Sequence, residues 1–438
     1  MFVTMRRMLS VFLFSLLLFF TVLGVFFIDS AKAASAKTPE LEWTHNFEKG
    51  EGHFVEQTKD GGYILTGWTE SRQEGSDVFL AKCDRDGNRL WMKTYQGNGY
   101  SDSHCVQEVK GGGFIIVGET KSKYGYDHDV YVVRTDEKGG QLWSKTFGGT
   151  HCDYAWAVQQ TKDGGFIVAG GTESYGAGIY DVYLIKLDSA GNEIWEKTYG
   201  GTGSDCAYAV RQLDDGGYLV AGNTESFGAV KPDVYLLRTD GNGKMLWQKT
   251  YGGKGSDYGW SLLKDEDGGY LIAGEKEIVS DQGGGFAAYL IKTDQDGNKL
   301  WEKTYAIKSG SSFYAISQAN DGGFIQTGKK ESTRGGYDLY VVKTDRNGAL
   351  VWEKTIAGSG SNSGYRILQA KDGSYAVVGK KGIAKSSGSD ILLLKLQSES
   401  NRNISFLLSL GITAAFIVAA STTAYLYFKR RKEKEWLD

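Results

Sequence analysis

One position that recurs at intervals of about fifty residues carries side chains able to bind a polar ligand. It holds a small or acidic residue in each of seven copies: Gly50, Ser101, Asp153, Asp205, Asp257, Ser311 and Asn362. Carboxylates gathered at one mouth can hold a cation or accept hydrogen bonds from a polyol. Asp153, Asp205 and Asp257 are therefore candidate ligand-binding residues. The favoured alternative is that each carboxylate caps the backbone amides of its own glycine-rich loop.

Three residues further along, every copy carries a flat side chain. The seven are His53, His104, Trp156, Tyr208, Trp260, Tyr314 and Tyr365. A ring of such side chains near an axis can stack on sugars or aromatic ligands, so Trp156, Tyr208 and Trp260 are candidate binding residues. Packing between adjacent copies is the favoured alternative.

Catalytic and metal-binding motifs are absent from the sequence. His53, His104 and His151 could form a metal cluster if neighbouring copies brought them together, but we interpret them as separate polar residues. The chain has no C-x-x-C, H-E-x-x-H, G-x-S-x-G or phosphate-loop pattern. We therefore expect no catalytic residue, metal or cofactor. An enzyme would need a non-repeating polar cluster, and the only mixed set that we find is Asp153, Asp205 and Asp257.

The elements that must position these residues are short strands. The tryptophans that mark the repeat are Trp43, Trp91, Trp143, Trp195, Trp247, Trp301 and Trp352. Each unit has four apolar runs rich in Val, Ile, Leu and Tyr, separated by Asp-Gly-Gly or Asp-x-x-Gly-Asn turns that are typical of hairpins. Four-stranded antiparallel units in series predict an all-β fold, the β-propeller.

The number of units and the way the ring closes also follow from the pattern. Seven first strands and seven third strands can be counted, but the chain has no fourth strand after residue 396. The run that begins at Leu41 supplies it from the other end. We predict a seven-bladed propeller over residues 41–396, closed by its N-terminal strand, which leaves no open sheet edge between the first and last blades.

The unit resembles the β-propeller repeats of secreted bacterial and archaeal surface proteins, on the pattern of residues 181–201 followed by 208–222. That resemblance implies a fold more than an activity. Asp188, Gly191 and Trp195 also resemble the tryptophan-docking repeat of quinoprotein dehydrogenases. This chain departs from that family in having seven units instead of eight and no adjacent cysteine pair, so no quinone cofactor is expected.

The two ends predict an envelope location. Residues 1–33 have Arg6 and Arg7, an uncharged apolar run and an Ala-Lys-Ala site, as in a signal peptide or an uncleaved signal anchor. After a linker at 34–40, the propeller and a juxtamembrane linker at 397–403, residues 404–428 carry no charge and are long enough for a transmembrane helix. The basic residues that follow place the tail, 429–438, in the cytoplasm and the propeller outside.

Composition and strand direction narrow the choice of partner. A net charge of -3 without a basic stripe argues against nucleic acid. Strand alternation puts the short hairpin turns toward the membrane and the longer loops outward. The four cysteines give no connectivity, although a bridge between Cys152 and Cys206 is conceivable.

We therefore expect a membrane-anchored, extracytoplasmic binding module whose outward loop face takes a surface glycan, a small polar ligand or a protein partner. The alternatives are a quinoprotein-like or glycan-processing enzyme with its site at the axial mouth, and a purely structural or adhesive surface protein. Fold class alone does not choose among them.

Overall fold

The structure, a computed structural model, describes residues 38–71, 75–122, 127–228, 231–279, 284–306, 310–383 and 388–399. The chain divides into two units, Met1–Thr38 and Pro39–Asp438, and every strand belongs to the second. The predicted signal segment, 1–33, and the predicted membrane span, 404–428, lie outside the described residues. Within the described ranges, no helix is both long and apolar enough to cross a bilayer.

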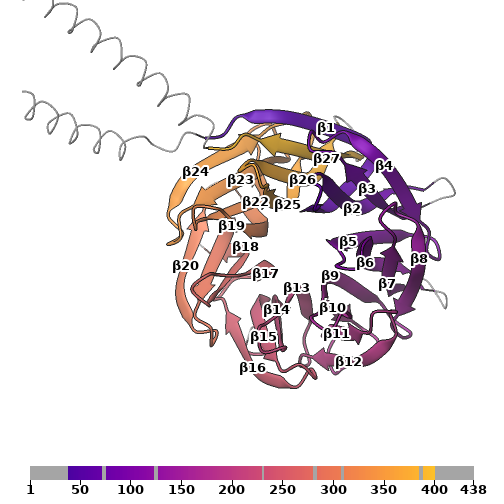
Figure 1. Cartoon of the computed structure of the whole chain (residues 1–438). Coiled ribbons are helices and arrows are strands. Elements are labelled where there is room, and N and C mark those ends of the chain that lie inside the picture. The colour runs from indigo at the N-terminus through magenta and orange to yellow at the C-terminus, as the bar shows by residue number, and fades with distance from the viewer. Residues whose placement is uncertain are drawn as a thin grey trace, which may run out of the picture. The chain divides into compact units, whose positions relative to one another are not determined.

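The strands fall into four ranks from the axis outward (Figure 1). The innermost rank comprises the second half of β1 (Leu41–Gln57), β5 (Ser101–Glu108), β9 (Asp153–Gln160), β13 (Asp205–Gln212), β17 (Asp257–Lys264), β21 (Ser311–Gln318) and β25 (Ser363–Gln369). The second rank comprises β2 (Tyr63–Glu70), β6 (Phe114–Lys121), β10 (Phe166–Thr172), β14 (Tyr218–Thr224), β18 (Tyr270–Ile278), β22 (Phe324–Glu331) and β26 (Tyr375–Gly382). The third rank comprises β3 (Ser76–Cys83), β7 (His128–Thr135), β11 (Asp181–Leu187), β15 (Asp233–Thr239), β19 (Gly285–Thr293), β23 (Tyr337–Thr344) and β27 (Ser389–Leu396). The outermost rank comprises β4 (Arg89–Tyr95), β8 (Gln141–Phe147), β12 (Glu193–Tyr199), β16 (Met245–Tyr251), β20 (Lys299–Tyr305), β24 (Leu350–Ile356) and the first half of β1.

These strands form five four-stranded sheets and one seven-stranded sheet, all antiparallel. The seven-stranded sheet contains two four-stranded units that share β1. Residues 41–49 of this strand pair with β27, and residues 50–57 pair with β2. The described strands therefore make seven units, with the outer edge of the last supplied by the strand that begins the first. This pairing is the closure that the sequence predicts.

The junction between the last and first units has the same contacts as the other junctions. In the third unit the amide of Lys162 donates to the side-chain oxygen of Gln212 in the fourth unit, at 2.8 Å. At the closure the amide of Lys371 donates to the side-chain oxygen of Gln57, at 3.0 Å. The ring is therefore sealed by packing as well as by strand pairing.

The marker tryptophans join each unit to the next. The ring of Trp143 on β8 covers Gly191, which lies in the hairpin turn between β11 and β12. Gly191 has a φ of +78°, and a Cβ there would lie 2.6 Å from the indole, so the turn requires glycine for both reasons. At the junction between the first and second units, the Tyr95 hydroxyl donates a hydrogen bond to the carbonyl of Gly139 at 2.8 Å.

The hydrophobic core lies between adjacent units. One cluster joins Val117 and Val132 of the second unit to Val168 and Ile185 of the third, and six similar clusters are found among the described residues. Strands of the second and third ranks are buried on both faces, which explains their continuous apolar runs. Outermost strands are only partly buried and carry charged residues such as Glu196, Lys197 and Lys249.

A buried cation also recurs near the end of each third-rank strand. Lys343 is the clearest case, because its side chain is 1% exposed and its ammonium group lies 2.7 Å from the carboxylate of Asp321. That aspartate belongs to the Asp-Gly-Gly turn, and its carboxylate also accepts the amide of Gly323. The repeated aspartate therefore shapes the turn and neutralises the buried cation.

Candidate functional site

The innermost strands surround a cavity of about 670 Å³ on the axis of the ring. It extends from Glu51 and Asp102, at the beginning of their strands, to Glu56 and Leu368, near the strand ends. This volume lies in the range of sites that enclose small molecules, about 300–1,000 Å³.

A β-bulge in every innermost strand places the flat side chains at this cavity. In the first unit Gly52 pairs with Gly67 and Phe54 pairs with Thr66, so His53 is the extra residue of the bulge. The equivalent residue is skipped in the other six units as well. A bulge turns a side chain out of the regular alternation, which directs each ring toward the axis.

The seven rings form a closed circle of neighbours. Consecutive ring centroids lie between 3.9 Å, for His104 and Trp156, and 6.4 Å, for Trp260 and Tyr314. All seven line the cavity and are only partly buried. The two interpretations of this position are thus compatible, since the rings pack on one another across units and still present surface to the axial space. The candidate binding residues Trp156, Tyr208 and Trp260 therefore lie on the wall of the axial cavity.

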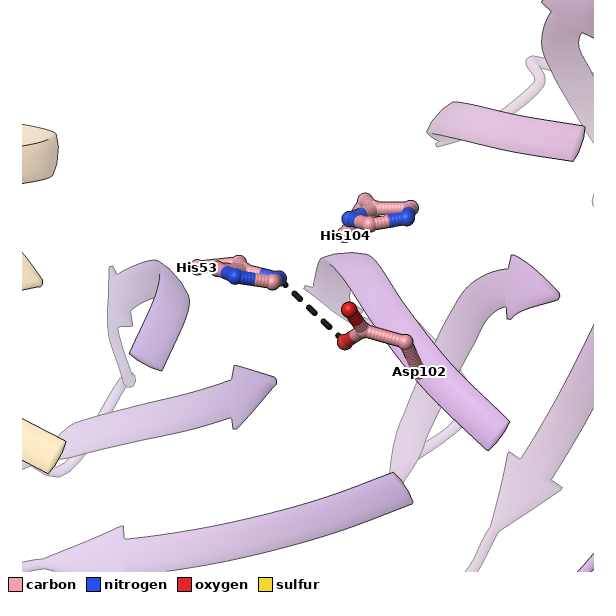
Figure 2. Close-up of side chains that lie close together, drawn as sticks. All are labelled: His53, Asp102 and His104. Atoms are coloured by element: carbon pink, nitrogen blue, oxygen red, sulfur yellow. Dashed lines mark ion pairs between the residues drawn. The ribbon is translucent and has the colours of Figure 1, made fainter. Parts of the chain in front are cut away.

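One sector of the circle brings two imidazoles together with two carboxylates, a combination that no other unit of the described residues has. His53 and His104 stack with their ring centroids 5.1 Å apart. Nδ1 of His53 lies 3.3 Å from a carboxylate oxygen of Asp102, and Nε2 of His104 lies 2.7 Å from a carboxylate oxygen of Glu119. Figure 2 shows the two imidazoles and the Asp102 carboxylate around a common gap. The expectation that the chain has no such cluster apart from the three loop aspartates is therefore wrong.

Glu51 completes this cluster and links it to the last unit. Its carboxylate accepts hydrogen bonds from the Tyr365 hydroxyl at 2.9 Å and from Lys380 at 3.0 Å, and lies 3.7 Å from Nε2 of His53. Burial alone would raise the pKa of Glu51, but His53 and Lys380 lower it to about 2. Burial would lower the pKa of His53, but Asp102 and Glu51 raise it to about 10. Glu51 and His53 are therefore both charged at neutral pH.

Two guanidinium groups, those of Arg211 and Arg366, line another part of the cavity. Arg366 lies over the ring of Phe54 at 4.6 Å, and its Nε has no hydrogen-bond partner among the described residues. Burial and the charge of Arg211 lower the pKa of Arg366 to about 10, so Arg366 is cationic at neutral pH. The nearby carboxylate of Glu56 accepts the amide of Glu108 at 2.9 Å.

Asp153, Asp205 and Asp257 are not brought together at this cavity. Each opens an innermost strand, each is at most 1% exposed, and none is among the described residues that line the axial space. The Asp153 carboxylate accepts hydrogen bonds from the Gly149 amide at 2.9 Å and the Ser174 hydroxyl at 2.7 Å. Asp205 has the equivalent pair of donors. These are the contacts that a loop cap makes.

Asp257 differs from the other two aspartates. Ile278 stands where the other units have Ser174 and Ser226, and neither carboxylate oxygen of Asp257 has a hydrogen-bond partner among the described residues. Burial raises the pKa of Asp257 to about 6, assisted by the charge of Asp233 and opposed by that of Lys276.

The structure also bears on the predictions for His151 and for the cysteines. His151 is exposed in the loop between β8 and β9 and is not part of the axial cluster, so the three histidines do not meet. The four cysteines are free, including Cys152 and Cys206.

Comparison with known proteins finds only distant similarity. No family model matches the chain. The regulatory protein FlaEY of Caulobacter vibrioides is 26% identical over 202 residues, which is 40% of this chain and 21% of that protein. The chain thus spans about a fifth of the curated relative that it matches.

Solved structures with a similar chain trace include the polysaccharide lyase Uly1, with a TM-score of 0.50 and 11% identity over 79% of this chain and 90% of that one. Sqt1 from Chaetomium thermophilum scores 0.48 with 10% identity, covering 82% and 99% of the two chains. The β-propeller domain of the Trilobed protease from Pyrococcus furiosus scores 0.43 with 13% identity, covering 82% and 96%. Identities this low relate folds and not activities. Repeated four-stranded antiparallel sheets around an axis make this chain a β-propeller.

Proposed function

We propose that this propeller is a binding module and that its ligand site is the axial cavity, where it takes a carbohydrate with an acidic group. The circle of seven flat side chains around a cavity of about 670 Å³ carries this proposal. Aromatic faces pack well on the apolar face of a sugar ring. Carboxylates accept hydrogen bonds from the sugar hydroxyls, and imidazoles can accept or donate them.

The acidic group follows from the charges on the cavity wall. Arg366 offers an Nε donor without a hydrogen-bond partner among the described residues, Arg211 lines the same cavity, and Glu56 is the carboxylate that acts on Arg366. Guanidinium groups recognise carboxylates in a bidentate manner. A uronic acid residue therefore fits this wall better than a neutral sugar.

Binding of glucuronate-containing oligosaccharides to the purified full-length protein, measured by calorimetry beside neutral gluco-oligosaccharides, tests this function. We expect Trp260→Ala to weaken binding about tenfold, which corresponds to about 1.4 kcal/mol for a lost stacking contact. Arg366→Gln should remove the preference for the acidic sugar. Tyr337→Ala is the matched control, because Tyr337 is 39% exposed and is not among the described cavity-lining residues. Equal losses in Tyr337→Ala and Trp260→Ala would refute the axial site.

A glycan-processing enzyme is the second candidate, favoured by the non-repeating cluster of imidazoles and carboxylates beside the same wall. Paired acids and bases of this kind can transfer protons. The solved structure of Uly1 is named as a polysaccharide lyase, which makes polysaccharide a reasonable first substrate class to test. Shortening of an acidic polysaccharide by the wild-type protein, lost in His104→Gln, would support catalysis over binding.

The proposed setting is the outer face of a membrane. Its support is the signal-like segment at 1–33, the uncharged run at 404–428 and the basic residues that follow. A tag inserted in the loop at 176–178 of intact cells should be accessible to added protease, while a tag after Asp438 should be protected. The opposite pattern would overturn this topology.

A further inference from the structure

We propose that His53, Asp102 and His104 form a binding site for a divalent transition metal at the wall of the axial cavity. This site goes beyond the proposed carbohydrate site, and it does not depend on it. The two histidines are bulge residues of neighbouring units, and Asp102 lies two residues before His104 on β5. Asp102 pairs with Glu119 across the strands, and the bulge turns His104 toward Glu119, which brings these side chains together.

The distances between ligand atoms suit a metal after a small adjustment. One nitrogen from each imidazole and one Asp102 oxygen all lie within 4.8 Å of one another. Ligand atoms about 2.0–2.1 Å from a zinc ion lie roughly 3.3 Å apart in a tetrahedral arrangement. Bringing the three ligand atoms to this separation therefore requires side-chain shifts on the order of 1 Å. The stacked rings, tilted by 19°, must turn so that their nitrogens converge.

Carboxylates outside the cluster orient the imidazoles. Nε2 of His104 contacts Glu119 at 2.7 Å, which leaves Nδ1 as its nitrogen for a metal. Nε2 of His53 lies 3.7 Å from Glu51, while its Nδ1 faces Asp102 at 3.3 Å. Metal-bound histidines commonly donate their second N–H to a carboxylate, which fixes the tautomer and increases the basicity of the ligand nitrogen. On metal binding, Nδ1 of His53 gives up its contact with the Ser103 carbonyl at 3.1 Å.

The local charge matches a dication. Glu51, Asp102 and Glu119 contribute three negative charges, and the ammonium group of Lys380, bonded to Glu51, contributes one positive charge. With both imidazoles neutral, as metal ligands must be, the remainder is two negative charges, which a divalent ion would neutralise.

The donor set indicates which metals fit. Two imidazole nitrogens and one carboxylate oxygen favour first-row ions such as Zn²⁺, Fe²⁺ or Co²⁺ over Mg²⁺ and Ca²⁺, which prefer oxygen ligands. Three protein ligands leave further coordination positions, as in metal sites that act on a bound molecule. Because His53, Asp102 and His104 all line the cavity, these positions face the axial space.

Calorimetric titration of the chelator-treated full-length protein with Zn²⁺ and with Co²⁺ tests the site. We expect one ion per chain, a Co²⁺ ligand-field spectrum typical of mixed nitrogen and oxygen ligands, and loss of both signals in His104→Gln. Glu119→Gln should weaken binding about 10–100-fold without abolishing it, because Glu119 positions His104 and is not a ligand. His151→Gln is the matched control, since His151 is an exposed loop histidine.

Absence of Zn²⁺ and Co²⁺ binding to the wild-type protein would overturn the proposal. Binding that persists in a His53→Gln, His104→Gln double variant would also overturn it, because the ion would then bind elsewhere. Far-ultraviolet circular dichroism and melting of each metal-free variant exclude loss of fold as the cause. Sugar binding is measured separately, so failure of the metal site and failure of the carbohydrate site give different results.

Discussion

Replacing Asp257 by asparagine should stabilise the propeller at neutral pH, whereas the same change at Asp153 should destabilise it. The Asp153 carboxylate accepts two hydrogen bonds from its loop, but no described residue donates to Asp257. A pKa of about 6 in the folded state, against about 4 in an unfolded chain, means that ionising Asp257 costs on the order of 3 kcal/mol. An asparagine amide still lacks partners, which removes about half of this gain, so about 1–2 kcal/mol remains.

The size of the effect in a melting experiment follows from the length of the domain. With about 2.1 cal/mol/K of unfolding entropy per residue over 41–396, this gain corresponds to a rise in Tm of about 2 °C. Asp153→Asn and Asp205→Asn should lower Tm, because each loses hydrogen bonds to a charged group worth about 0.5–2 kcal/mol.

The stabilising effect of Asp257→Asn should depend on pH. Because the folded pKa of Asp257 is raised, its contribution to stability is fully present below pH 4 and is lost as the pH rises through 6. The difference between Asp257→Asn and the wild type should therefore be largest above pH 6 and small near pH 4. A loss of stability in Asp257→Asn equal to that in Asp153→Asn, at every pH, would refute the reasoning.

Three further predictions concern closure and charge. Deleting residues 34–49 should lower Tm far more than shortening a surface loop, because the last unit loses its outer strand. A change of only a few degrees in scanning calorimetry would contradict a role for β1 in closing the ring. Asp321→Ala should lower the free energy of unfolding by about 2 kcal/mol, because the buried Lys343 loses its counter-charge. Adding Lys343→Met should restore most of this stability, as measured by urea unfolding. Equal stabilities of the single and double variants would contradict this expectation. Thr58 and Lys82 hold the pKa of Asp60 near 2 against burial, so its contribution is present above pH 4 and lost as the pH falls toward 2. Asp60→Asn should therefore flatten the acid limb of a pH-dependent melt, and an unchanged limb would contradict it.

The repeat made the fold predictable because each unit repeats its turn and docking residues. The spacing of Trp143 and Trp195 fixes the unit, and Gly191 marks a turn that only a glycine can occupy beneath an indole. The missing last strand pointed to Leu41, and this strand pairs with β27. Strand pairing was therefore readable from pattern alone.

The cavity cluster was not found from the sequence, although a signal for it exists. The position before each bulge holds Glu51 and Asp102 in the first two units but neutral residues, such as Tyr154 and Cys206, in others. A carboxylate two residues before a histidine in adjacent units marks a sector of the ring that differs from the rest. The width of the axial space and the direction of the rings depend on bulges, which leave no consistent mark in the residue pattern. Equally, the burial of Asp153 could not be inferred from its place in a polar loop.

The continuous strand β1 makes the ring mechanically asymmetric. Leu41 pairs directly with Leu396, so the two ends of the propeller leave it side by side, and the amide of Gln397 also donates to the carbonyl of Glu40 at 2.9 Å. A force that separates these ends loads the hydrogen bonds between β1 and β27 one after another, as in opening a zipper, and not all together. A propeller that resists heat through its packed junctions would thus open at low tension from this single point, releasing β1 from the last unit before any other sheet is disturbed.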